Sequence, residues 1–148
     1  MRGKFYESEY EEALIDLLQA EGWQYTNGGN IHRQLREPLL IEDEEHNLND
    51  LRVYLRNRYP DLTECDVNEV INHLRHVPGQ THFERLRNTC QLVRDGYRYT
   101  RHGDGVNFDI RFIDFDPDHT DHNIFRAVNQ FEVAYGMKDD VRIPDVLL

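Results

Sequence analysis

The chain has 148 residues, of which 39% are hydrophobic and 11% aromatic, and its formal net charge is −11. This is enough apolar material for one globular domain with a core, and no apolar run approaches the ~20 residues that a membrane-spanning helix needs. The negative charge weighs against nucleic-acid binding by this chain alone, because such binding depends mainly on neutralising phosphates.

A helix is predicted over residues 6–21 and ends at Gly22, a residue typical of helix C-termini. Apolar residues recur there at the helical period and form one face: Tyr6, Tyr10, Ala13, Leu14, Leu17 and Leu18. A short strand is expected at 23–25, followed by a turn at 27–30. A second helix is predicted over about 46–58, because Pro60 stops it.

Two capping boxes predict the next two helices. Thr63 with Asp66 opens one that runs through Leu74, and Thr81 with Glu84 opens another that ends at Gly96. The two cysteines, at positions 65 and 90, lack metal-ligand spacing, and the chain starts without an export signal. They therefore indicate buried thiols in a reducing cytoplasm, with Cys90 as part of the core.

Beyond Gly96 the alternation of apolar and polar residues predicts a hairpin, with strands at 97–100 and 108–115. Residues 124–133 fit both a helix and a strand, and their Phe and Val content favours a strand. Residues 146–148 are expected to pair with that strand after a turn at 136–140. Helices followed by a meander predict an α/β (α+β) fold, with a mixed, largely antiparallel sheet in a single domain over 1–148.

One candidate for chemistry is Asp145, which follows Pro144 and opens an apolar strand. A carboxylate at a sheet edge suits Mg²⁺, which prefers oxygen ligands. A metal-dependent nuclease needs at least one more carboxylate and usually a lysine near the attacking water. Glu7 and Glu11, four residues apart on the first helix, are the candidates. The alternatives are a turn or cap for Asp145, and a solvated helix face for the two glutamates.

Two other features leave alternatives open. The pairs His73 with His76 and His119 with His122 suggest zinc, but neither pair has a clear third ligand. Arginines are frequent between Arg75 and Arg111, which predicts either one basic face on an acidic body or a mixed solvated surface. No phosphate-binding glycine loop and no Gly-x-Ser-x-Gly motif occurs.

Four stretches carry a resemblance to a known family: "YESEYEEALIDLLQAEGWQY", "NIHRQLREPLLIEDEEHNLNDLRVYL", "NIFRAVNQFEV" and "RIPDVLL". Together they resemble the N-terminal part of type I restriction enzyme R subunits, from about Phe5 to Leu148. The Asn-Gln-Phe strand followed by Pro-Asp and an apolar strand is the most specific element. The resemblance implies a PD-(D/E)xK nuclease domain of the restriction-endonuclease-like type, truncated before the strand that carries Glu-x-Lys.

In that family Asp145 would match the Mg²⁺-binding, catalytic aspartate, and Glu11 or Glu7 an acidic ligand from the first helix. The parent protein would be a type I site-specific deoxyribonuclease that cleaves double-stranded DNA with Mg²⁺. Its ATP-driven motor would lie outside this chain, and its partners would be the modification and specificity subunits. This portion alone is expected to be catalytically incomplete and a weak DNA binder at best. The alternative is a small acidic interaction protein that imitates the charge of DNA.

Overall fold

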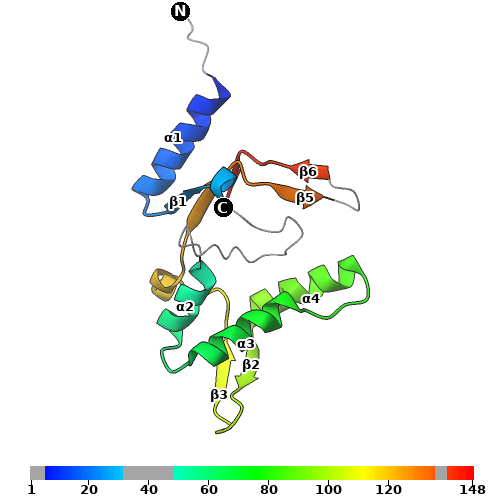
Figure 1. Cartoon of the computed structure of the whole chain (residues 1–148). Coiled ribbons are helices and arrows are strands. Elements are labelled where there is room, and N and C mark those ends of the chain that lie inside the picture. Colours follow the sequence, from blue (N-terminus) through cyan, green and yellow to red (C-terminus); the bar gives the residue numbers. More distant parts are fainter. Residues whose placement is uncertain (1–5, 32–48, 136–139) are drawn as a thin grey trace, which may run out of the picture. The chain divides into compact units, whose positions relative to one another are not determined.

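The computed structural model describes residues 6–31, 49–135 and 140–148, which divide into two compact units (Figure 1). Unit 1 contains the described residues 6–31, 124–135 and 140–148, and unit 2 contains residues 49–123. The single domain predicted over 1–148 stays a prediction, because the compactness of each unit does not decide whether either one folds alone. No helix among the described residues is long and apolar enough to cross a membrane.

The first helix of unit 1 is α1 (Glu7–Ala20), which confirms the helix predicted over 6–21. Gly22 follows it with φ +91°, a conformation that favours glycine. The face that packs inward is different from the predicted apolar face. Ile15 is the residue that α1 buries, whereas Tyr6, Leu14 and Leu17 are exposed. The helical period located an apolar stripe, but Ile15 belongs to the neighbouring face, and that face meets the sheet.

The sheet of unit 1 has the strand order β1 (Gln24–Asn27), β4 (Arg126–Asn129), β7 (Val146–Leu147). β1 is parallel to β4, and β7 is antiparallel to β4. The strand predicted within 124–133 and its pairing with 146–148 are therefore confirmed. Ala127 and Val128 of β4 are buried at the centre of the sheet.

Unit 1 also contains a hairpin that the sequence did not predict, formed by β5 (Val133–Tyr135) and β6 (Asp140–Arg142). The single predicted strand over 124–133 is interrupted at Gln130, whose φ of +51° lies in the left-handed region. The interruption ends β4 at Asn129 and lets β5 begin separately. The turn predicted at 136–140 falls mostly on residues 136–139, which lie outside the described residues, as does the part of the second helix predicted before residue 49.

Unit 2 contains the helices α2 (Asp50–Arg58), α3 (Glu64–Arg75) and α4 (His82–Asp95). Both predicted capping boxes are present: Thr63 with Asp66 begins α3, and Thr81 with Glu84 begins α4. The core of unit 2 is formed by Tyr54, Leu55, Leu62, Val67, Val70, Ile71, Leu74, Tyr99, Ile110 and Phe112. Most of this burial comes from α2 and α3 and from the hairpin.

The hairpin of unit 2 pairs β2 (Tyr97–Thr100) with β3 (Asn107–Ile110), and a 3₁₀ helix follows at Pro117–His122. The strand predicted to reach residue 115 ends at Ile110. The reason is that the side chain of Tyr59 takes the place of a partner strand. Its hydroxyl accepts a hydrogen bond from the Arg111 N–H at 2.8 Å and donates one to the Asp109 carbonyl at 3.0 Å. Hydrogen-bonding groups that a partner strand would satisfy are thus satisfied by Tyr59.

The prediction of buried thiols is wrong, because both Cys65 and Cys90 are exposed. The sequence predicts Cys90 in the core because Cys90 lies on the apolar face of its helix. That face exists, but within the described part of the chain no residue of α4 is fully buried. Periodicity identifies an apolar face and does not determine whether anything covers it.

Candidate functional site

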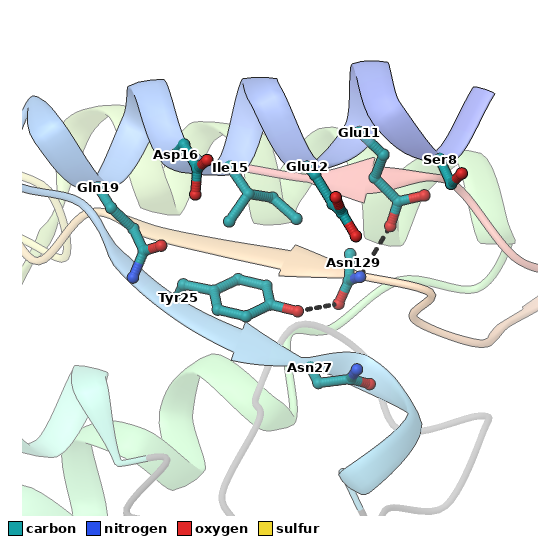
Figure 2. A pocket seen from close by; sticks show the side chains of 9 residues that line it. All are labelled: Ser8, Glu11, Glu12, Ile15, Asp16, Gln19, Tyr25, Asn27 and Asn129. Atoms are coloured by element: carbon teal, nitrogen blue, oxygen red, sulfur yellow. Dashed lines mark hydrogen bonds between the residues drawn. The ribbon is translucent and has the colours of Figure 1, made fainter. Parts of the chain in front are cut away.

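The candidate site lies in unit 1, between α1 and the strands β1 and β4 that it covers (Figure 2). Ile15 fixes α1 on the sheet because it is the buried residue of that helix. Glu11 lies one turn earlier, on the same side, and is partly buried. The packing of one apolar side chain therefore directs a carboxylate toward the end of β4.

Asn129, the last residue of β4, connects this carboxylate to the sheet. Its side-chain Nδ2 donates to Glu11 Oε1 at 2.7 Å, and its Oδ1 accepts from the Tyr25 hydroxyl at 2.9 Å (Figure 2). Both ends of the amide are thus used, which fixes its orientation. The result is a chain of hydrogen bonds from β1 through β4 to α1.

Gln130, the next residue, joins the same carboxylate to the strand that Asp145 precedes. Its side-chain Nε2 donates to Glu11 Oε2 at 3.2 Å, and its backbone N–H donates to the Asp145 carbonyl at 3.3 Å. Gln130 has a φ of +51°, which costs a residue with a Cβ on the order of 1–2 kcal/mol. Gln130 therefore brings together two of the acidic residues that the sequence singled out.

The backbone that follows β4 is packed against Gly28. A Cβ at Gly28 would overlap the Asn129 carbonyl oxygen and would lie 2.7 Å from Phe131 Cα. Only glycine allows so close an approach. Gly28 thus packs against the backbone of the turn that contains Asn129 and Gln130.

A cavity of about 400 Å³ opens beside these residues. It is lined by three carboxylates, three amides and three other side chains: Ser8, Glu11, Glu12, Ile15, Asp16, Gln19, Tyr25, Asn27 and Asn129 (Figure 2). Its charge is negative, so it attracts cations and repels free phosphate groups. The amide side chains add further oxygen atoms of the kind that hard cations prefer as ligands.

The three predicted site residues differ in their position relative to the cavity. Glu11 lies in the cavity, and Asp145 is tied to Gln130 through its carbonyl while its side chain is exposed. Glu7 is exposed and does not line the cavity. Within 6–31, 49–135 and 140–148, no group of three or more His, Cys, Asp or Glu side chains is positioned to hold a metal ion. The roles of Glu11, Glu7 and Asp145 as Mg²⁺ ligands stay predictions.

Sequence reasoning did not assign a role to the side chains of Tyr25, Asn129 and Gln130. The sequence does contain a pattern that indicates them: two consecutive amides end an apolar strand, where polar residues commonly lie at a sheet edge. Their partner, Glu11, is 118 residues away from Asn129. Only the packing of α1 on the sheet shows that these residues meet.

The histidines considered for zinc have other partners. His73 stacks on Tyr97 with ring centroids 4.0 Å apart. His119 and His122 each place Nδ1 on a carboxylate, that of Asp116 at 2.9 Å and that of Asp114 at 3.1 Å. The hydrogen bond and charge of Asp116 raise the pKa of His119. Since no third ligand joins either pair in the described part of the chain, the structure does not support the zinc hypothesis.

The arginines between Arg75 and Arg111 do not make a uniformly basic face. Arg94 pairs with Asp95 at 2.7 Å, and Arg98 pairs with Asp109 at 3.0 Å. Arg101 binds the buried Asp66 at 2.9 Å. Of the two alternatives that the sequence left open, the mixed surface describes these residues better.

Asp66 is a structural carboxylate outside the candidate site. It is 3% exposed and accepts hydrogen bonds from Thr63, Tyr99 and Arg101. Burial by itself raises the pKa of Asp66, but the hydrogen bonds from these partners outweigh burial and hold that pKa well below its usual range. Its charge therefore serves to tie α3 to the β2–β3 hairpin.

Comparison with known proteins agrees with the resemblance seen in the sequence. Residues 4–148 match the family described as type I restriction enzyme R protein N terminus. The chain is 29% identical, over 151 aligned residues, to the type I restriction enzyme HindI endonuclease subunit of Haemophilus influenzae. That alignment covers 95% of this chain and 13% of the relative. No solved structure gives a significant match.

Proposed function

Because this chain belongs to the family of the type I restriction enzyme R protein N terminus, we propose that it forms the first part of an R-subunit nuclease domain of the PD-(D/E)xK class. In this proposal Asp145 and Glu11 contribute to the Mg²⁺ site. The observation that carries it is the bridge through Gln130, which binds the Glu11 carboxylate and the Asp145 carbonyl. Two acidic residues from opposite ends of the chain thus belong to one small region of unit 1.

The donor set fits Mg²⁺ in kind, because it consists of carboxylate and amide oxygens and contains no thiolate or imidazole. It does not fit in number, since the described residues supply no group of three acidic ligands and the chain contains no Glu-x-Lys. Asp145 and Glu11 would hold part of the ion's coordination shell, with Glu7 as a third candidate one turn before Glu11. A bound Mg²⁺ would polarise the phosphodiester and help to generate the attacking hydroxide.

The side chains of this region have two tasks in the proposed function. The amides of Asn129 and Gln130 hold the Glu11 carboxylate in one orientation, which lowers the cost of ordering it when a cation binds. The acidic cavity keeps a phosphodiester away unless a cation neutralises it. DNA would therefore approach this region only together with the metal.

The rest of the activity belongs to the longer protein. The chain spans 13% of the length of the curated relative that it matches. In that longer protein we expect Mg²⁺-dependent cleavage of double-stranded DNA, ATP-driven translocation by a motor outside this chain, and docking to modification and specificity subunits in the cytoplasm. This chain by itself is expected to be inactive, because it lacks the Glu-x-Lys of the motif.

The test uses a longer protein that contains this chain and the Glu-x-Lys region. Asp145→Ala should abolish Mg²⁺-dependent DNA cleavage and leave the far-UV circular dichroism unchanged, because the Asp145 side chain is exposed. Glu11→Gln should reduce cleavage, and Glu21→Gln, an exposed glutamate at the far end of α1, should leave it intact. Retained cleavage in the Asp145 variant would contradict the proposed role of that residue.

A further inference from the structure

The helix α4 presents an apolar face that is exposed among the described residues of unit 2. Phe83 is 72% exposed and Leu86 is 63% exposed, and Cys90 is exposed as well. Their spacing of three and four residues places all three on one side of the helix. We call Phe83, Leu86 and Cys90 the α4 face.

Local interactions fix both ends of this helix. A capping box formed by Thr81 and Glu84 begins it, and Gly96, with φ +70°, ends it. An isolated helix of this length is marginally stable in water, and large apolar side chains that are exposed together mark interaction surfaces. The preformed helix with its uncovered face thus has the properties of a docking element.

The charges on α4 are arranged around this face. At 3.6 residues per turn, Arg87 and Arg94 lie along one edge of the α4 face. The carboxylate of Glu84 lies away from it and accepts the backbone N–H groups of Gln80 and Thr81. Arg94 forms a salt bridge with Asp95, and Arg87 is exposed beside the apolar side chains. The edge of the α4 face is therefore positive.

We propose that the α4 face docks an amphipathic helix of a partner protein whose apolar stripe is edged by carboxylates. Apolar side chains would cover Phe83 and Leu86, and carboxylates would pair with Arg87 and Arg94. DNA fits less well, because a phosphate backbone covers no apolar side chain.

Two synthetic helices of equal length with the same leucine stripe test this proposal, one edged by glutamate and the other by lysine. Fluorescence anisotropy of each labelled peptide is measured against the whole chain. The glutamate-edged peptide should bind, and the double variant Phe83→Ser/Leu86→Ser should weaken its binding by about tenfold or more. Gln91→Ser, an exposed position on the same helix outside the α4 face, should leave binding unchanged.

The charge requirement is tested by reversal. The variant Arg87→Glu/Arg94→Glu should lose the glutamate-edged peptide and gain the lysine-edged one. Equal binding of both peptides by the unmodified chain would overturn the proposal, as would preferential α4-dependent binding of duplex DNA or of anionic vesicles. Far-UV circular dichroism checks the fold of each variant; if the double serine variant unfolds, Leu86→Gln alone must still weaken binding for the proposal to stand.

Discussion

Asn129 donates a 2.7 Å hydrogen bond to Glu11 across 118 residues of sequence. The bond joins the end of the central strand β4 to the helix that begins the described chain, and Gln130 binds the other oxygen of the same carboxylate. A charged acceptor that is held by two amides is a stronger and better oriented group than one free in solvent. The stability and the candidate site of unit 1 therefore depend on the same contacts.

Asn129→Ala should lower the free energy of unfolding of unit 1 by about 1–3 kcal/mol, because it removes the donor to Glu11 and leaves the Tyr25 hydroxyl without its acceptor. Fluorescence of Trp23, the single tryptophan, measures this in a urea titration, since its ring packs against Phe125 in the same unit. Tyr25→Phe, which removes one hydroxyl, should cost less. An Asn129→Ala variant as stable as the unmodified chain would show that the bond does not stabilise the fold.

Gln130 allows the strain and the contact to be separated. Gln130→Gly removes the side-chain bond to Glu11 and also relieves the positive φ, whereas Gln130→Ala removes the bond and keeps the strain. The glycine variant should therefore be more stable than the alanine variant by about 1 kcal/mol. The same Trp23 titration compares them, and alanine proving equal to or better than glycine would refute the left-handed conformation.

Gly28→Ala should destabilise unit 1 by roughly 1–3 kcal/mol, because the new Cβ would overlap the backbone of Asn129 and Phe131, which cannot move without disturbing β4. Gly29→Ala is the matched control. A Cβ there would meet the side chain of Asn27 at 3.2 Å, and that side chain can give way. Equal thermal stability of the two variants would contradict the close approach at Gly28.

Asp66 should make unit 2 less stable at acidic pH. Its pKa is held below the ordinary value of 3.8 in the folded chain, so the unfolded state binds more protons as pH falls through that value. The stabilisation is fully present above about pH 5 and is lost as pH falls past 3.8 toward the folded pKa. Urea unfolding, followed by far-UV circular dichroism, measures the free energy of unfolding at each pH. Between about pH 5 and pH 3.8 this free energy should fall less for Asp66→Asn than for the unmodified chain. The exposed Asp118→Asn should behave like the unmodified chain.

The sequence predicted best those features that neighbouring residues decide. The capping boxes at Thr63 and Thr81 involve residues three apart, so their prediction needed no tertiary information. The break at Gln130 escaped prediction because distant groups, Gly28 and Asp145, hold its backbone. Likewise the period of α1 located an apolar stripe, but the contact with the sheet selected Ile15.

The candidate site shows the same division. Glu11 and Asp145 were selected from their residue type and from the family resemblance, and the structure links both to Gln130. The amides that hold Glu11 were not assigned, because a hydrogen bond across 118 residues leaves no local pattern in the sequence. Residue types thus suggested the chemistry, while the supporting contacts required the fold.

The parallel pairing of β1 with β4 also sets an order for synthesis. Gln24 is paired with Arg126, so the sheet of unit 1 cannot form until the ribosome has passed unit 2. All of residues 49–123 are synthesised before β4 exists. We therefore expect nascent chains released at residue 123 to contain α1 and β1 without a formed sheet, because β4, the strand that pairs with β1, is still missing.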